Sequence, residues 1–173
     1  MGVFETIQKR RSIRKYQNLP VEKEKIFKVL EAARLAPSAT NAQPCHFIVV
    51  TEPAIRESLR CAYNRDWFLS APVIIVVCAN PKEAWRRRDG EEYWKVDGAI
   101  AMQNLVLTAT ELGLATCWVA NFEKNGEKEI KKALNLPKDL KVIAMTPLGY
   151  PDEEKGPITE RKTFETIVHT EKW

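Results

Sequence analysis

Two short stretches near the N-terminus carry the residue types best suited to binding a charged ligand. Residues 10–14 read Arg-Arg-Ser-Ile-Arg, which places three guanidinium groups and a hydroxyl within five positions. Arginine meets a phosphate or another planar anion with paired, charge-assisted hydrogen bonds. Residues 37–44 read Pro-Ser-Ala-Thr-Asn-Ala-Gln-Pro, an uncharged run of hydroxyl and amide side chains between two prolines. Together the two stretches predict the halves of a site for a phosphorylated cofactor with a polar-edged aromatic ring.

Both stretches also have a purely structural interpretation. The arginines, with a second basic pair at Arg161 and Lys162, would then be solvated surface charges. Residues 37–44 would be a polar turn that ends a helix and leads into a strand. The residues alone leave both interpretations open. The sequence has no paired carboxylates placed for acid–base catalysis and no glycine-rich phosphate loop, so we expect a cofactor, and no catalytic side chain, to carry any chemistry.

The elements that must position these stretches alternate between helices and strands. Apolar residues at 26, 29, 30 and 33 predict a helix over 22–35, which Pro37 ends. Strands are predicted at 47–50, at 73–78, at 115–119 and in a segment ending at Leu148-Gly149. Because 73–78 is apolar throughout, we expect both of its faces to be covered.

Two further helices and the tail bear on assembly. Residues 97–112 are apolar on nearly every side, which indicates a central core helix or one in a subunit interface. A charged amphipathic helix is predicted over 126–134. A short first helix over 3–9 is expected to bury Phe4 and Ile7. Residues 163–170 contain Ile167-Val168 and are expected to add a strand to a sheet edge, in the same subunit or in a partner.

Composition narrows the class of protein. At 173 residues the chain fits one domain, 1–173, and the interspersed net charge of +4 argues against nucleic-acid binding. No apolar run approaches the roughly 20 residues that span a bilayer, and no secretory signal is evident, so we expect a cytoplasmic protein that does not enter membranes. The four cysteines lack metal-ligand spacing, so no metal site is expected, and Cys78 and Cys117 are expected to fill the core.

The segment 10–16, Arg-Arg-Ser-Ile-Arg-Lys-Tyr, resembles the N-terminal signature of the nitroreductase family of flavoproteins. Further stretches agree with that family in order and spacing. They are residues 37–44, Ala71-Pro72 before an apolar strand, 113–118, 148–151 and Arg161-Lys162 before 167–169. The resemblance covers essentially the whole chain, and its specificity lies in the joint order of the motifs.

The resemblance implies an α+β fold, with a central mixed, mostly antiparallel sheet flanked by helices and a C-terminal extension onto the partner subunit of a homodimer. It implies one FMN at each of two sites between the subunits. NADH or NADPH would reduce flavin N5 and leave, and an electron-poor small molecule such as a nitroaromatic or a quinone would then take its place. The alternatives are a specialised member that consumes its flavin or dehalogenates a substrate, and a flavin-binding dimer without turnover.

The resemblance also implies roles for individual residues. Arg10, Ser12 and Arg161 would bind the FMN phosphate with Arg11 and Lys162 close by, and Arg14 would lie near the pyrimidine end of the ring. The remaining flavin contacts would be Pro37, Ser38, Ala39, Asn41 and Gln43 from the other subunit, Asn64 at the pyrimidine edge, and the backbone N–H groups of Ala120 and Asn121 near N5 and O4.

Two departures from the family concern access to the ring. The family commonly has glycine after Trp118-Val119, whereas this chain has Ala120-Asn121, which narrows the space above the flavin. The chain is also short for the family, and residues 80–96 are the one obvious candidate for a variable lid over the pocket. Their Trp85, Tyr93 or Trp94 would stack on an aromatic substrate, or pack in the core or in an interface.

Overall fold

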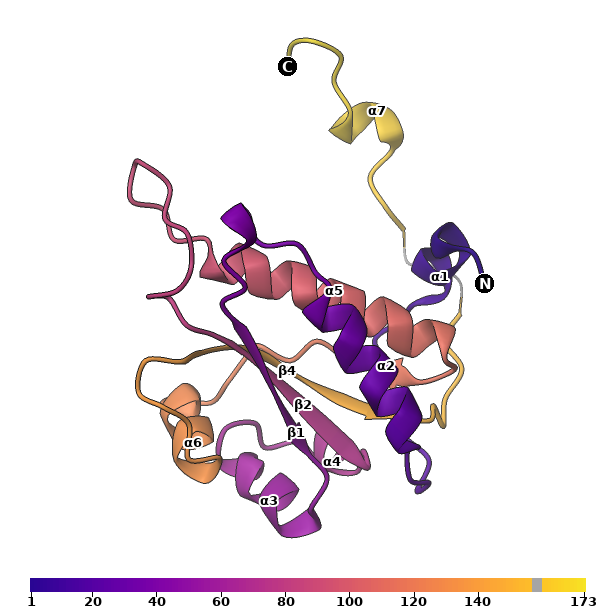
Figure 1. Ribbon diagram of the computed structural model, residues 1–173. Coiled ribbons are helices and arrows are strands. Elements are labelled where there is room, and N and C mark those ends of the chain that lie inside the picture. The colour runs from indigo at the N-terminus through magenta and orange to yellow at the C-terminus, as the bar shows by residue number, and fades with distance from the viewer. Residues whose placement is uncertain (157–159) are drawn as a thin grey trace.

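A four-stranded sheet forms the centre of the computed structural model, which describes residues 1–156 and 160–173 (Figure 1). Its strands are β1 (Cys45–Val50), β2 (Val73–Ala79), β3 (Ala115–Thr116) and β4 (Lys141–Gly149), in the order β1-β2-β4-β3. All three neighbouring pairs are antiparallel. Ser12 adds a parallel bridge to Thr116 at the β3 edge. The predicted mixed, mostly antiparallel sheet is confirmed.

Helices cover both faces of this sheet. The side chains of β2 point alternately to the two faces, and those on each face pack against helices. The helices are α1 (Val3–Lys9), α2 (Lys23–Arg34), α3 (Pro53–Ser58), α4 (Asp66–Leu69), α5 (Trp94–Glu111), α6 (Gly126–Ala133) and α7 (Phe164–Ile167), with 3-10 turns at Ala39–Asn41 and Leu59–Cys61. Val73, Ile75 and Val77 pack with residues of α2 and α5. Ile74 and Val76 pack on the opposite face with residues of α4 and α6. Every residue of β2 is therefore buried, as its apolar sequence predicts.

The N-terminal end of α5 lies unusually close to β4. A Cβ on Gly98 would lie 1.8 Å from Cδ1 of Ile143, so a larger residue here would force the Ile143 side chain to move. Of the two environments predicted for this helix, the core is confirmed for one face, which includes Ala101, Met102 and Leu105. Its other face leaves Val96 44% exposed.

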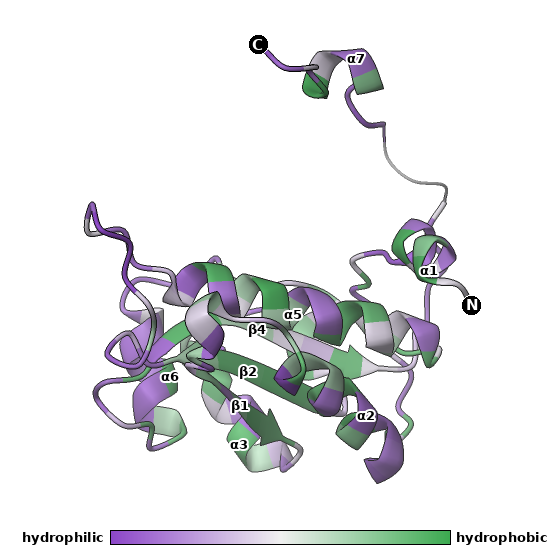
Figure 2. Cartoon of the chain, turned by 45° about the horizontal axis from the view of Figure 1, so that its top comes forward, coloured by the Kyte–Doolittle hydropathy of each residue, from purple (hydrophilic) through white to green (hydrophobic). Residues whose placement is uncertain are grey.

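Two expectations about the ends of the chain are wrong within this chain. Phe4 and Ile7 are 72% and 48% exposed, because α1 is anchored through Thr6, its one buried residue. The segment 163–170 forms the short helix α7 and adds no strand to the described sheet. All residues from 160 to 173 are exposed, and Figure 2 shows this tail lying apart from the sheet and its covering helices.

The four cysteines are free, and Cys78 and Cys117 are buried, as predicted. The described residues contain no cluster of three or more metal-ligating side chains. None of the described helices combines the length and apolar character needed to cross a membrane.

Candidate functional site

The stretch from Arg10 to Arg14 runs as extended chain along the β3 edge of the sheet. The Ile13 N–H donates to the Thr116 carbonyl at 3.0 Å, and the Tyr16 hydroxyl donates to the Ile13 carbonyl at 2.6 Å. Side chains of an extended segment alternate between its two sides. Ile13 points into the core, where it is 8% exposed, so Arg10, Ser12 and Arg14 share the opposite side.

The buried thiol of Cys117 interacts with all three of these side chains. Burial raises the pKa of Cys117, while the charge of Arg14, a hydrogen bond with Ser12 and the charge of Arg10 act in the opposite direction. The structure thus places two of the predicted cationic groups and the predicted hydroxyl on the same side of the extended segment, where all three influence Cys117.

The adjacent arginines Arg10 and Arg11 have different environments. Arg11 Nη1 donates to the carbonyls of Gln8 at 2.6 Å and Arg10 at 2.8 Å, and its Nε donates to the Gly156 carbonyl at 3.3 Å. Arg11 therefore fastens the end of α1 to the segment after β4. Within the described residues, the guanidinium of Arg10 donates to no group, which leaves it available to a ligand.

Arg14 is held by two contacts that the sequence does not predict. Its backbone N–H donates to Oε1 of Glu153 at 2.5 Å, and this bond is the main reason that the pKa of Glu153 lies below its ordinary value. The Arg14 guanidinium lies over the Trp67 ring, 5.7 Å from its centre. These contacts bring α4 and the segment after β4 to the same edge of the sheet.

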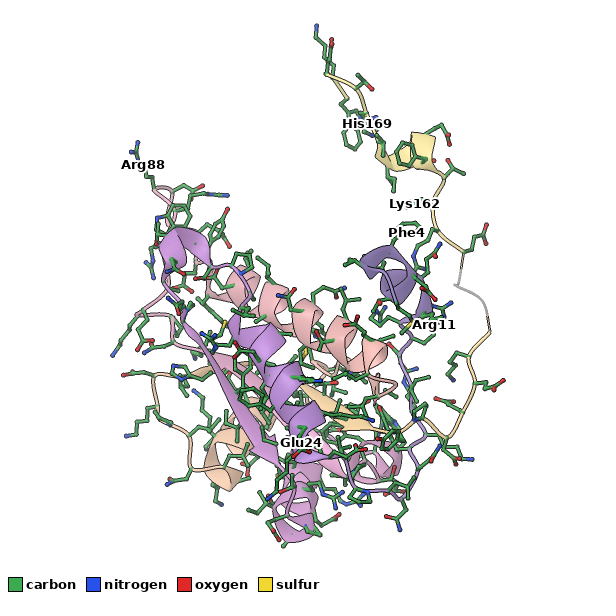
Figure 3. All side chains as sticks on the ribbon, turned by 45° about the vertical axis from the view of Figure 1, so that its right-hand side comes forward. Phe4, Arg11, Glu24, Arg88, Lys162 and His169 are labelled. Carbon is green, nitrogen blue, oxygen red and sulfur yellow. The ribbon has the colours of Figure 1, made fainter. Side chains whose placement is uncertain are left out.

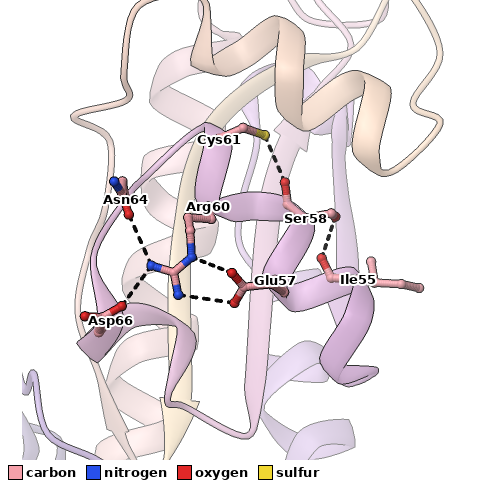
Figure 4. Close-up of polar contacts among 7 residues, drawn as sticks. All are labelled: Ile55, Glu57, Ser58, Arg60, Cys61, Asn64 and Asp66. Atoms are coloured by element: carbon pink, nitrogen blue, oxygen red, sulfur yellow. Dashed lines mark hydrogen bonds and ion pairs between the residues drawn. The ribbon is translucent and has the colours of Figure 1, made fainter.

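Asn64 lies in the connection that precedes α4, and Arg60 holds its side chain (Figure 4). Arg60 Nη1 donates to Oδ1 of Asn64 at 3.1 Å and to Oδ1 of Asp66 at 2.8 Å, while the rest of its guanidinium binds Glu57. Because its oxygen accepts from Arg60, Asn64 presents its NH₂ group as a donor.

Ala120 and Asn121 continue the same edge beyond β3. Val119 exchanges two backbone hydrogen bonds with Met145, at 2.9 and 2.8 Å. The next two residues are exposed, and in the described part of the chain their N–H groups donate to no other residue. They therefore present two free backbone donors, and their contact with a flavin stays a prediction.

Residues 37–44 lie at the N-terminal end of α5, far from the 10–14 stretch (Figure 1). The Ala39 N–H donates to Oδ1 of Asp97 in the first turn of α5, at 3.1 Å. The 10–14 stretch instead approaches the last turn, where Arg11, Ile13 and Thr110 line one pocket. Thr110 lies thirteen positions after Asp97, which is about 20 Å along a helix. Within one chain the two predicted halves are therefore not brought together.

The loop 37–44 has a strained backbone. Thr40, Asn41 and Gln43 have φ values of 54°, 58° and 51°, in the left-handed region that non-glycine residues seldom adopt. The Gln43 N–H donates to Oγ of Ser38 at 2.8 Å, which closes the loop on itself. Such strain is concentrated at binding sites, where the surrounding structure maintains it.

The last two predicted positions, Arg161 and Lys162, lie on the exposed tail. Figure 3 shows Lys162 on this tail, outside the body of the fold. Their approach to a phosphate stays a prediction.

Residues 85–93 form a small hairpin before α5, with Arg88 at its tip (Figure 3). The Tyr93 N–H donates to the Trp85 carbonyl at 3.3 Å, and the two rings meet edge to face with centres 4.8 Å apart. Trp94 donates from Nε1 to Glu92 at 3.0 Å. The aromatic side chains thus pack within their own segment, and a lid function stays a prediction.

Asp97 is the site residue that sequence reasoning missed most clearly. Only 2% of it is exposed, and it lines a cavity of about 100 Å³ together with Ser38, Gln43 and Cys45. Burial, reinforced by the charge of Asp97, raises the pKa of Cys45 to about 11. The available signal was an acid within the otherwise apolar run from Val96 to Met102.

Comparison with known proteins identifies the family that shares this architecture. The profile described as "Nitroreductase family" matches residues 7–63 and 59–150. A nitroreductase family protein from Clostridium difficile 630 is 36% identical, with complete coverage of both chains and a TM-score of 0.88. An FMN-dependent nitroreductase from Clostridium difficile R20291 is 35% identical over 98% of this chain and 99% of its own, with a TM-score of 0.84. An NADH dehydrogenase from Thermus thermophilus is 30% identical over 92% of this chain and 91% of its own. Since both the profile and the solved structures follow the chain through the β3 edge and the 37–44 loop, the protein belongs to the nitroreductase family of oxidoreductases.

Proposed function

We propose that this protein is an FMN-dependent oxidoreductase that uses NADH or NADPH to reduce nitroaromatics, quinones or similar electron-poor small molecules. The observation that carries the proposal is the row of groups along the β3 edge. Arg10, Ser12 and Arg14 share one side of an extended segment, and the free N–H groups of Ala120 and Asn121 follow on the neighbouring segment. The FMN-dependent nitroreductase from Clostridium difficile R20291 supports the cofactor assignment.

The groups present fit FMN in chemistry and order. The uncommitted guanidinium of Arg10 and the hydroxyl of Ser12 would bind the phosphate, since a dianion attracts charge-assisted donors. The Ala120 and Asn121 N–H groups would donate to acceptors of the ring, and Asn64 would donate from its NH₂ group. When bound, FMN would supply the hydride transfer that no side chain of this site provides.

Arg14 would act on the charge of the bound ring. Its guanidinium is kept near Trp67, and its backbone is fixed by Glu153. A fixed positive charge stabilises negative charge that develops beside it during a reaction. Arg14 would therefore favour the reduced form of a ring whose pyrimidine end lies next to it.

We further propose a homodimer in which residues 37–43 contact the FMN bound by Arg10 and Ser12 of the partner subunit. The separation of the two stretches along α5 supports this arrangement. So do the exposed apolar side chains of α1 and the tail, such as Phe4 (72%) and Phe164 (72%), which lack a covering layer in the single chain. The tail would carry Arg161 and Lys162 toward the phosphate.

Anaerobic mixing tests the proposal. The purified protein, reconstituted with FMN, is mixed with NADH or NADPH, and flavin absorbance is followed before an acceptor is added. We expect bleaching by at least one donor and return of the colour with a quinone or nitroaromatic. A protein that takes up no FMN contradicts the proposal. A bound flavin that stays oxidised with both donors supports a flavin-binding dimer without turnover instead.

A further inference from the structure

Asp97 is a buried acid with one oxygen that the fold does not use. Oδ1 accepts from the Ala39 N–H at 3.1 Å, whereas Oδ2 is fully buried and has no hydrogen-bond partner among the described residues. A buried carboxylate with so few partners is costly to keep. Its position at the base of the 37–44 loop indicates what it does there.

Asp97 makes the side-chain contact that ties this loop to the helix behind it. The other hydrogen bonds of residues 38–43 lie within the loop: the Asn41 N–H donates to the Ser38 carbonyl at 2.9 Å, the Ala42 N–H to the Ala39 carbonyl at 3.1 Å, and the Gln43 N–H to Oγ of Ser38 at 2.8 Å. Among the described residues, no other side chain from outside the loop bonds to residues 38–43. These internal bonds maintain the turn, whereas the Asp97 contact joins it to α5. At the end of the loop, the Asn80 N–H donates to the Pro44 carbonyl at 2.9 Å.

The position of Asp97 is itself fixed by the packing of α5. The next residue, Gly98, lets the helix approach Ile143 of β4 so closely that a Cβ would lie 1.8 Å from its Cδ1. The first turn of α5 therefore packs directly on β4. A rigid helix end is a suitable anchor for a strained loop.

We infer that Asp97 is the positioning residue of the flavin-binding loop: its carboxylate holds the Ala39 N–H and keeps Thr40, Asn41 and Gln43 in the left-handed conformation of the loop that contacts FMN. This inference rests on the proposed function for its ligand, but the anchoring is a property of the protein alone. Asp97 does not touch the flavin in this proposal. It acts only through Ala39 and the residues that follow.

The test compares Asp97→Ala, which removes the acceptor, with Asp97→Asn, which keeps an oxygen for Ala39 and removes the charge. Full-length protein is titrated with FMN, and quenching of flavin fluorescence gives the dissociation constant. We expect Asp97→Ala to weaken FMN binding about tenfold or more, the value of a lost hydrogen bond to a charged group. Asp97→Asn should stay within about threefold of the wild type.

Hydrogen exchange without FMN provides the second readout. The Ala39 amide should exchange faster in Asp97→Ala than in the wild type, and Asp97→Asn should restore its protection. Ile130→Val is the control, since it removes one methyl from the opposite core and lies far from the loop. It should lower the thermal stability without changing Ala39 exchange or FMN affinity. Asp97→Ser, whose hydroxyl is too short to reach Ala39, replaces the alanine variant if that one does not fold.

The outcomes separate the two proposals. If the wild type binds no FMN, the proposed function fails, and Ala39 exchange still decides whether Asp97 anchors the loop. Unchanged Ala39 exchange in Asp97→Ala overturns the inference. So does wild-type FMN affinity in a variant whose Ala39 exchange has risen, because the anchored conformation is then not what FMN requires.

Discussion

Replacement of Arg10 by alanine should remove FMN affinity at almost no cost to the fold. The Arg10 backbone N–H caps α1 by donating to the Thr6 carbonyl, and alanine keeps this bond. The guanidinium makes no hydrogen bond within the described residues. Its loss should therefore change the melting temperature of the FMN-free protein by very little.

The expected loss of affinity follows from the contact proposed for this guanidinium. A hydrogen bond to a charged group contributes about 1.5–3 kcal/mol. At 1.4 kcal/mol for each tenfold change, Arg10→Ala should weaken FMN binding by about 10- to 150-fold. A titration followed by flavin fluorescence measures this change directly.

Arg11→Ala is a matched control, because it removes the same charge one residue away. A unit charge about 10 Å from a dianion in water contributes roughly 0.8 kcal/mol, and salt at 0.15 M screens most of it. Arg11→Ala should therefore weaken FMN binding only about twofold. It should instead destabilise the protein by about 1 kcal/mol, because its guanidinium bonds to the carbonyls of Gln8, Arg10 and Gly156.

Equal losses of affinity in the two variants would refute the assignment, because they would show that FMN senses only the summed charge of this stretch. Unchanged affinity in Arg10→Ala would refute it as well. Riboflavin, which lacks the phosphate, adds a further check. Its affinity should be the same in the wild type and in Arg10→Ala.

Three further changes test other parts of the structure. Gly98→Ala should destabilise the protein by about 1–3 kcal/mol, since its Cβ meets Ile143, and a melting temperature equal to the wild type would contradict that packing. Cys61 is the exposed cysteine, so a thiol reagent at pH 8 should modify one cysteine rapidly and none in Cys61→Ser. Because the Arg14 N–H lowers the pKa of Glu153 below 4.5, its stabilisation is present above that pH and is lost as the pH falls through the folded-state pKa. Between pH 5 and 3, the free energy of unfolding should therefore fall by about 0.5–1.5 kcal/mol less in Glu153→Gln than in the wild type. An unchanged pH profile would show that this bond does not form.

The elements with a strong apolar pattern could be predicted from the sequence. The extent of elements without such a pattern could be predicted less well. The uniform apolar run of β2 and the stripe of α2 indicate burial on their own. The strand predicted over 115–119 is regular only at Ala115–Thr116. At the next residue, the Cys117 N–H donates to the hydroxyl of Thr146 in place of a backbone carbonyl, which interrupts the hydrogen-bond ladder. No local sequence pattern predicts this side-chain bond.

Some site residues could likewise be predicted from local sequence patterns, and others could not. The grouping of Arg10, Ser12 and Arg14 follows from alternation once α1 is known to end at Lys9. The burial expected for Phe4 was wrong in the single chain, because an apolar residue on a helix indicates a covered surface without saying which chain covers it. Asp97 was missed since its role depends on the 37–44 loop crossing the start of α5, a contact between residues 58 positions apart.

The length of α5 links cofactor binding to subunit association under the proposed function. One chain places its phosphate-binding stretch and its ring-contacting loop about 20 Å apart, at the two ends of a continuous helix. A flavin that needs both can be completed only by a second chain. Each subunit then supplies Arg10 to one flavin and the Asp97-anchored loop to the other. Because binding and association draw on the same contacts, each must strengthen the other by the same free energy.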